Sequence, residues 1–319
     1  MTKKSVLVAC LLLAFQFSMA QIIRTQQIDT TSNWSKSNKV GLDLSQITFV
    51  NWNAGGNNSI SGLLKGQFIR TYSEKNLHWK NELIARYGIN KQDAQEARKT
   101  DDQLQFNSTI GFRTDTISNW YYAGKFNFNT QFANGYAYPN TRLAISKPFA
   151  PAYIFLGIGA EYSRKDLKLN VYLSPLTNKT TFVFDTRLAN QGAFGVEKAV
   201  YQYDESGAII GTLKNGKKTR TEVGILVTNQ WKNEIYTNIN LEHRVSLYTD
   251  YINNFGNIDV DWQLQLAMKV NQYVKANIGT HLVYDDDIKF KEEVAGTQVI
   301  KGPRLQLKQL LGVGVEYTF

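Results

Sequence analysis

The sequence predicts an all-β fold, a transmembrane antiparallel up-and-down β-barrel of about 12 strands, within a range of roughly 10 to 14. Three observations support this prediction. Apolar and polar residues alternate over long segments, the connections between these segments are alternately short and long, and the chain ends on the alternating segment GVGVEYTF. Such alternation gives each strand one face for lipid and one face for the lumen.

The composition excludes several classes of protein. The 319 residues are 43% hydrophobic and 13% aromatic, with a formal net charge of +9. This polarity is too high for a bundle of membrane-spanning helices. The basic residues are spread along the chain and no nucleic-acid-binding motif is present, so we expect no nucleic acid among the partners.

The N-terminus predicts a secretory signal peptide over residues 1–20. Two lysines are followed by an apolar run of roughly a dozen residues that ends in small residues at Ala20. The run is too short to cross a bilayer as an anchor. We therefore expect cleavage near Ala20/Gln21. Cys10, the only cysteine, would be lost, which leaves no disulfide, thiol nucleophile or cysteine metal ligand.

Residues 21–38 are expected to form a short polar N-terminal segment, and 39–319 the barrel. In the barrel region helical periodicity is hard to find and alternation is common. From Val260 to Val270, for example, every even position is apolar and the odd positions are polar except Ala267. The expected strands are 39–50, 59–72, 77–90, 103–115, 119–132, 152–163, 167–174, 219–231, 235–250, 257–270, 273–286 and 304–319.

The connections alternate in length. Short polar turns are expected around 73–76, 116–119, 163–166, 232–234 and 271–272. Longer links are expected at 51–58, 91–102, 133–151, 175–218, 251–256 and 287–303. An even number of strands places both termini and the short turns on the periplasmic side, with the long loops outside the cell. Thr180–Phe184 forms an additional hairpin in the fourteen-strand alternative.

A secreted soluble β-sandwich or lipocalin-like barrel would also show alternation, but two features favour the membrane. Several expected strands have about 14 residues, more than the roughly 10 that a tilted strand needs to cross a bilayer. Aromatic residues gather near strand ends, as in the two interfacial girdles of membrane barrels. They are Trp52, Tyr72, Trp79, Trp120, Tyr121, Tyr122, Tyr136, Tyr138, Trp231, Tyr248, Tyr251, Tyr284 and Tyr317.

The C-terminal strand explains why the chain stops on Phe319. Alternate residues from Leu311 to Phe319 are apolar and are expected to face outer-membrane lipids. This strand must pair with the first one, near Val40–Leu44, because an open edge is not tolerated in hydrocarbon. The pattern is similar to the C-terminal signal of outer-membrane barrels, so we expect the barrel-assembly machinery as a partner.

The stretch NWNAGGNNSIS at 51–61 resembles the NWxxGGxNSxS signature of an uncharacterised outer-membrane β-barrel family, domain of unknown function 3078. Further segments fit the same family pattern: 150–153, 156–162, 173–177 and 192–196. The resemblance spans most of the mature chain. It implies a barrel in the outer membrane of a Gram-negative bacterium and implies no activity. Gly55 and Gly56 are interpreted as loop glycines that need positive φ, rather than as a ligand site.

The sequence predicts no catalytic residue, no cofactor and no metal site. His78 and His281 are expected to face inward and His243 outward, and no nucleophile motif accompanies them. Asp285–Asp287 could supply oxygen ligands for Ca²⁺, but the spacing of a dedicated calcium loop is missing, so a solvated charge run is favoured. The basic segment 214–220 is interpreted either as a site for lipopolysaccharide phosphates or as a soluble loop.

Alternation also predicts a lumen lined by charges of both signs. The inward cations are Lys65, Lys80, Arg86, Arg113, Lys125, Lys168, Arg220, Arg244, Lys269, Lys275 and Lys308. The inward acids are Asp43, Glu82, Glu161, Glu222, Glu242, Asp259, Asp261 and Glu316. Paired charges would either occlude the lumen or line a narrow polar channel, and both interpretations stay open.

These observations predict a non-enzymatic integral outer-membrane β-barrel. It is expected to act as a narrow channel for small polar solutes, whose ion selectivity would change on neutralising Lys269 or Lys275, or as an envelope-organising barrel. One alternative is an outer-membrane lipid hydrolase that uses His78 or His281. Another is a surface scaffold or adhesin that acts through the 175–218 loop. The sequence leaves the solute and the oligomeric state open.

Overall fold

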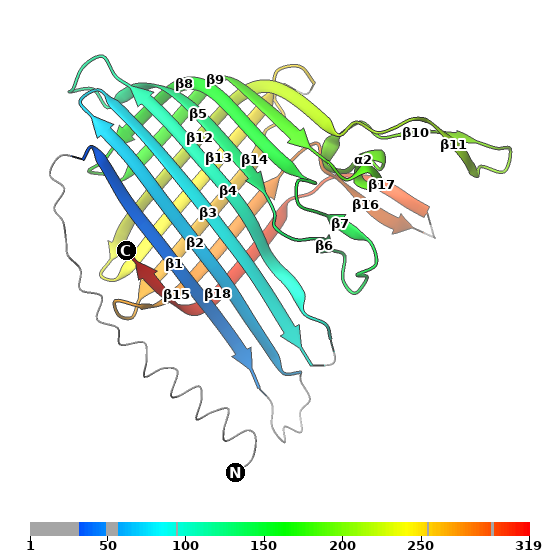
Figure 1. Ribbon diagram of the computed structural model, residues 1–319, viewed down its shortest axis with the longest axis horizontal. Coiled ribbons are helices and arrows are strands. Elements are labelled where there is room, and N and C mark those ends of the chain that lie inside the picture. The colour runs from blue at the N-terminus through cyan, green and yellow to red at the C-terminus, as the bar shows by residue number, and fades with distance from the viewer. Residues whose placement is uncertain (1–31, 49–56, 94, 254, 295–296) are drawn as a thin grey trace, which may run out of the picture. The chain divides into compact units, whose positions relative to one another are not determined.

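The computed structural model describes residues 32–319 apart from 49–56, 94, 254 and 295–296, and in this part of the chain twelve strands close into one barrel (Figure 1). Each strand pairs with its neighbours in antiparallel fashion. In order round the ring they are β1 (Trp34–Ile47), β18 (Gln306–Thr318), β15 (Val274–Tyr284), β14 (Asp259–Lys269), β13 (Ile239–Asp250), β12 (Thr219–Tyr236), β9 (Leu169–Phe182), β8 (Ala152–Arg164), β5 (Trp120–Thr130), β4 (Arg98–Phe112), β3 (Leu77–Gln92) and β2 (Ser59–Glu74).

All twelve expected strands are present, but most of their limits differ by a few residues. β4 begins at Arg98 rather than at residue 103, and β12 runs to Tyr236, so the turn expected at 232–234 lies at 237–238 instead. β1 begins at Trp34 rather than at residue 39, because its pairing with β2 continues to Trp34↔Tyr72. Residues 34–38, expected in the polar N-terminal segment, therefore belong to a strand. The signal peptide lies outside the described residues, as do Trp52 and the Gly55–Gly56 pair.

β9 continues past its expected end at residue 174 and runs to Phe182. A proline normally ends a strand because it cannot donate to the ladder, but a β-bulge accommodates one. The register shifts at Pro175 against both neighbouring strands. The single hydroxyl proton of Ser174 is shared between the carbonyls of Ile158 and Leu176, whose oxygens lie 2.8 and 2.9 Å from Oγ, where the bulge interrupts the ladder. Residues 180–182 therefore extend β9 and do not form an additional hairpin.

The last strand closes the barrel against the first, as the sequence predicts. The register runs from Lys39↔Thr318 to Leu44↔Val313. Phe319 extends this seam by two backbone hydrogen bonds with Asn38, of 3.0 and 3.1 Å. Its ring stacks on that of Tyr317, with centroids 5.5 Å apart.

The outer face of the barrel is apolar. On β18, Leu307, Leu311 and Val313 are exposed by 65%, 71% and 55%. Water would not stabilise such a continuous apolar surface, whereas lipid does. Among the aromatic residues assigned to the girdles, Tyr248 and Tyr121 lie inside the barrel instead. Tyr248 is buried against Phe155, and Tyr121 packs on His78. Each occupies a strand position that faces the lumen, while the residues next to it in the strand face outward.

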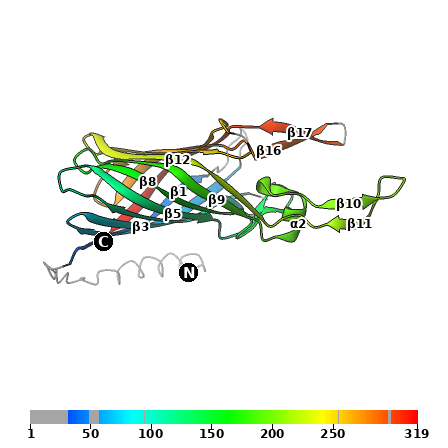
Figure 2. The ribbon, with the colours of Figure 1, turned by 90° about the horizontal axis from the view of Figure 1, so that it is seen from above.

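Three small two-stranded sheets lie in the long connections: β6 (Gly135–Tyr136) with β7 (Ala144–Ser146), β10 (Val200–Tyr203) with β11 (Ile209–Lys214), and β16 (Lys289–Val294) with β17 (Thr297–Pro303). Figure 2 shows the last two hairpins extending beyond the same end of the barrel. The 175–218 connection also contains α2 (Thr186–Asn190) and the 3-10 turn η1 (Ala193–Gly195), which pack around Val183 and Leu188. Among the described residues, no helix is long and apolar enough to cross a membrane.

Candidate functional site: the barrel lumen

Two polar cavities occupy the lumen. The outer chamber has a volume of about 400 Å³ and extends from Tyr284 and Asp285, next to the long connections, to Glu161 and Asn170, near the short turn between β8 and β9. The inner chamber has a volume of about 250 Å³ and extends to Lys232 and Lys269, next to the short turns. Arg244 and Gln263 line both chambers. These two side chains therefore stand where the chambers meet.

An ion pair crosses the lumen at this position. The guanidinium of Arg244 donates to the two carboxylate oxygens of Glu82 at 3.0 and 3.2 Å. Arg244 is on β13 and Glu82 on β3, and five strands separate them in either direction round the ring. The pair thus joins opposite walls of the barrel. Gln67 donates to Glu82 at 2.5 Å, and Arg244 also donates to Glu242 at 2.7 Å, so both ends of the pair are held in place.

A second connection crosses part of the lumen. Lys308 on β18 lies 2.8 Å from the carboxylate of Asp101 on β4, and Arg86 lies 2.7 Å from the other oxygen of the same group. The side chain of Asp101 is 3% exposed. A carboxylate this buried requires a cationic partner, and here it has two.

The wall of the outer chamber is rich in amides. Side-chain hydrogen bonds run from Gln105 to Asn107 at 3.2 Å and from Asn127 to Asn107 at 2.6 Å. Gln103, which lines the inner chamber, donates to Gln105 at 2.9 Å. Lys125 donates to the hydroxyl of Thr228 at 2.8 Å. Amide and hydroxyl groups both donate and accept hydrogen bonds, so this wall can replace part of the hydration shell of a polar solute.

Glycines on the inner face of β18 leave room for side chains of its neighbours. A Cβ atom on Gly314 would collide with the Asp43 carboxylate and with the backbone of Leu42. Asp43 therefore reaches over β18, where it binds Lys65 at 2.7 Å and accepts from Asn277 of β15 at 3.3 Å. These contacts fix the wall of the inner chamber along the closing seam.

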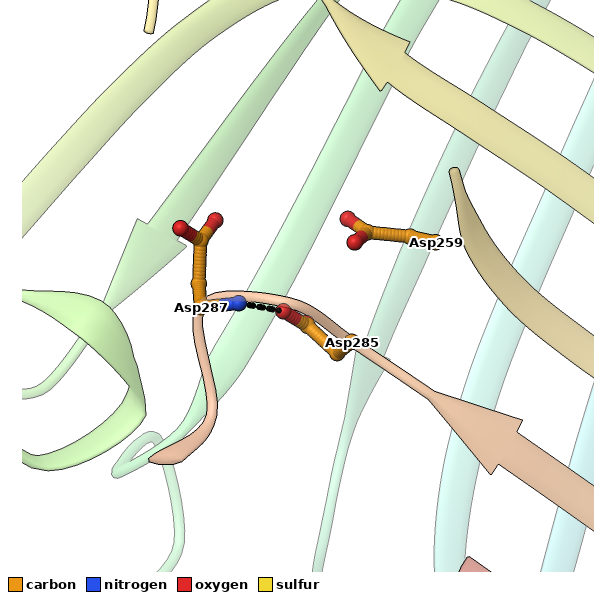
Figure 3. Close-up of side chains that lie close together, drawn as sticks. All are labelled: Asp259, Asp285 and Asp287. Atoms are coloured by element: carbon orange, nitrogen blue, oxygen red, sulfur yellow. Dashed lines mark hydrogen bonds between the residues drawn. The ribbon is translucent and has the colours of Figure 1, made fainter. Parts of the chain in front are cut away.

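Three carboxylates meet at the mouth of the outer chamber. Figure 3 shows Asp285 and Asp287 on the segment after β15, and Asp259 at the start of β14. Each offers one oxygen within 4.8 Å of the others. Lys179 lies 2.7 Å from Asp259 and 3.8 Å from Asp285, and Arg220 lies 2.8 Å from Asp287.

These two cations serve as partners of the three acids, so the group forms an ion-pair network. Asp285 lies beyond the end of β15. Burial raises the pKa of its carboxyl above the usual range, and Asp259 adds to this effect although Lys179 opposes it.

The three histidines lie on separate strands and have separate partners. His78 Nε2 is 2.9 Å from Glu161, and His281 Nε2 is 3.0 Å from Asp261. His243 lies on the outer face, where its Nδ1 accepts from the indole of Trp262 at 3.1 Å. Its Nε2 is 2.6 Å from the amide oxygen of Asn229, which requires a proton on Nε2. Among the described residues no serine hydroxyl is hydrogen-bonded to these rings.

The basic segment 214–220 has acidic partners in the structure. Lys214 and Lys217 lie 2.5 and 2.7 Å from Glu197, and Arg220 lies 2.9 Å from Glu222. Glu197 follows η1 in the same long connection. The contacts tie the two parts of this connection together.

Most of the inward charges that alternation predicts do line the two main cavities or the smaller one beside Asp101. The exceptions are Arg113, Lys168, Arg220 and Glu222. Lys168 lies in the turn before β9 with a φ of 50°, where the alternation does not hold. Several charged lumen residues are absent from the predicted set, among them Lys39, Asp101, Lys179 and Lys232. The last three were assigned to connections, and Lys39 was the first residue of its expected strand. Extending the alternation from Asp43, which is expected to face inward, back to Lys39 would have identified it.

Residues 44–136 match the family model described as "Protein of unknown function (DUF3078)". The family resemblance is confirmed over these residues, and the segments expected to fit it at 150–153, 156–162, 173–177 and 192–196 lie outside the match. The part that matches the DUF3078 model includes β2, β3, β4 and β5, and it begins near the end of β1. No curated protein matches the chain.

Several solved structures of outer-membrane barrels are similar to the chain. An outer membrane channel from Pseudomonas putida F1 shares 9% identity with a TM-score of 0.38, covering 89% of this chain and 95% of the other. The translocator domain of the autotransporter NalP from Neisseria meningitidis shares 10% identity with a TM-score of 0.36, covering 90% and 87%. OprB from Pseudomonas putida shares 8% identity with a TM-score of 0.31, covering 90% and 94%. At these values the likeness carries no information on what this chain binds or transports.

The protein is an integral outer-membrane β-barrel. Because the ring is closed, the backbone N–H and C=O groups of each barrel strand pair with a neighbouring strand on both sides, as a hydrocarbon environment requires. The apolar outer face of the barrel is suited to contact with lipid. The charged and amide side chains lie inside. Cleavage of the signal peptide stays a prediction.

Proposed function

We propose that this barrel is a narrow channel for small polar solutes. The observation that carries the proposal is the pair of polar cavities that meet at Arg244, of which the outer one reaches the long connections and the inner one reaches the short turns at Lys232 and Lys269. Solutes would enter one chamber, pass the Arg244–Glu82 ion pair, and leave through the other chamber.

The ion pair is suited to a role as a filter rather than as a fixed plug. Both side chains border open cavities, and Arg244 is 23% exposed. A long flexible side chain that borders free volume on two sides can change rotamer without disturbing the barrel wall. Gln67 and Glu242 offer the two charges alternative partners when the pair opens. Hydrogen-bonding groups on both sides lower the cost of removing water from a solute.

Osmotic swelling of proteoliposomes tests this proposal. Purified protein would be reconstituted and diluted into isosmotic urea, glycerol, arabinose or raffinose. We expect swelling with urea and glycerol, a slower rate with arabinose, and none with raffinose. The double variant Glu82→Gln/Arg244→Gln should admit larger solutes, whereas Lys165→Gln, in an exposed turn outside the lumen, should behave as the wild type. Swelling no faster than that of protein-free liposomes, with heat-modifiable folded protein present, would reject the channel.

A further inference from the structure

The two chambers differ in charge. The inner chamber is lined by seven basic and three acidic side chains. The outer chamber is lined by four basic side chains other than histidine and by five acidic ones. The excess of positive charge is therefore confined to the inner chamber, at the end of the barrel that carries the short turns.

Five of the seven basic groups have carboxylate partners. Lys65 binds Asp43, Lys232 binds Glu242 at 2.6 Å, and Lys275 binds Glu316. Arg86 and Arg244 bind Asp101 and Glu82. Within the described ranges, the remaining two, Lys39 and Lys269, lie in no ion pair. All three acids that line the chamber are already committed to other cations.

The positions of the two unpaired lysines concentrate the excess of positive charge in the inner chamber. Lys269 lies directly opposite Lys275 in the β14–β15 register, and both side chains line the chamber. Like charges in directly opposite positions destabilise a sheet. Lys39 is on β1, separated from β14 by β18 and β15, so it approaches the same cavity from a neighbouring wall. Repulsion among Lys39, Lys269 and Lys275 destabilises the empty barrel, and an anion bound between these lysines would relieve it.

The neighbouring neutral groups are also suited to an anion. Asn240, Gln265 and Asn277 line the chamber and can donate amide hydrogens. The volume of about 250 Å³ is small for a ligand pocket, which restricts the ligand to a few heavy atoms. Rings of lysine and arginine are the usual filter of pores that conduct anions or phosphate.

We propose that the inner chamber binds a small oxyanion, a phosphate or a short carboxylate, held by Lys39 and Lys269. The proposal names the solute class of the channel and so rests on the proposed function, but binding can be measured without conduction. The anion enters from the side of the short turns, where the chamber lies, and the Arg244 guanidinium is the next cation on its path.

Isothermal titration of detergent-purified, folded protein with inorganic phosphate and with succinate tests the binding. We expect saturable binding to the wild type, and at least a tenfold weaker affinity for Lys39→Gln/Lys269→Gln. Lys165→Gln, with the same change of charge per site in an exposed turn, should keep the wild-type affinity. Both variants should stay heat-modifiable, because neither replaced lysine of the double variant supports an acid. A short-chain phosphatidic acid, too large for the chamber, should not compete with phosphate; competition would identify a lipid headgroup as the ligand.

Two results would overturn the proposal: no saturable binding of either anion to the wild type, or equal affinity of the wild type and the double variant. Reversal potentials measured in a KCl gradient distinguish a failure of the anion-site proposal from a failure of the channel proposal. An anion-selective conductance that loses its selectivity in the double variant supports both proposals. A conductance without anion preference rejects the inner site alone. Phosphate binding without any conductance rejects the channel and retains the site.

Discussion

Deleting Phe319 should destabilise the closed barrel and impair its assembly. The β1–β18 seam is short, with a ladder that runs only from Lys39↔Thr318 to Leu44↔Val313 before Phe319 adds its two bonds with Asn38. By contrast, β1 pairs with β2 along its whole length. The deletion therefore shortens the β1–β18 ladder, which is already the shorter of the two ladders that β1 makes.

The size of the effect follows from the contacts that are lost. Two backbone hydrogen bonds contribute about 1–3 kcal/mol in total, since each is worth about 0.5–1.5 kcal/mol net. The stacked pair of Phe319 and Tyr317 adds about 0.5–1.5 kcal/mol. We expect the free energy of unfolding to fall by about 1.5–4.5 kcal/mol. Phe319→Ala keeps both backbone bonds and should lose only the stacking contribution.

Urea titration of protein folded into short-chain lipid vesicles measures the free energy of unfolding, and mobility on unheated SDS gels reports closure. Export across the inner membrane should be unchanged, whereas the amount of folded protein in outer-membrane fractions should fall. The reasoning would be refuted by a deletion variant that unfolds at the wild-type urea midpoint and reaches the outer membrane at wild-type abundance. Equal losses for the deletion and for Phe319→Ala would show that the two backbone bonds contribute nothing.

Three further predictions follow from the outer face, the lumen and the long connection. Val313→Lys places a charge on the lipid face near the middle of β18 and should destabilise the barrel by about 2–4 kcal/mol in urea titrations, whereas Val313→Thr should cost clearly less. Arg244→Gln alone leaves Glu82 buried without its cation and should cost about 3–5 kcal/mol; adding Glu82→Gln should recover most of that loss, and additive losses would contradict the cross-lumen pair. In the long connection, burial raises the pKa of Asp185, but hydrogen bonds from Lys147 and the Leu188 amide outweigh it and lower the pKa below its usual value. The ionised Asp185 carboxylate therefore stabilises the fold at pH values above its unfolded pKa of about 4. This stabilisation is lost as the pH falls through the lower pKa that Asp185 has in the folded protein. Amide exchange in α2, corrected for its intrinsic rate, should rise below about pH 4 in the wild type and be independent of pH in Asp185→Asn.

The strands and their order could be predicted from the sequence because both depend on local chemistry. A strand with one face in lipid and one in a polar lumen needs alternation with a period of two. Short polar turns fix which strands are neighbours, and a closed ring then forces β18 against β1. The pairing of Val40–Leu44 with the last strand follows from these constraints.

The continuation of β9 could not be predicted in this way. Pro175 is a signal for the end of a strand, and only tertiary contacts show that the bulge is satisfied by Ser174 and Thr177. As a result Lys179 was assigned to a loop, although it lies inside the barrel against Asp259. The residues of the segment 173–177 make this bulge.

The connections across the lumen were beyond the sequence for a different reason. Alternation tells which face a side chain occupies but does not tell how far round the ring its partner lies. Arg244 and Glu82 are 162 residues apart in the chain. Gly314 shows the same limit: alternation places it inside, where a charge is electrostatically acceptable, but the Asp43 side chain that crosses it leaves no space for a Cβ atom.

Single-channel recording in planar bilayers tests the central claim most directly, namely that the two chambers form one path through the membrane at Arg244. The wild type should give stepwise currents, Glu82→Gln/Arg244→Gln a larger unit conductance, and Lys165→Gln the wild-type value. If the folded wild-type protein gave no steps above the lipid background, or if removing the ion pair left the unit conductance unchanged, the path through Arg244 would be contradicted.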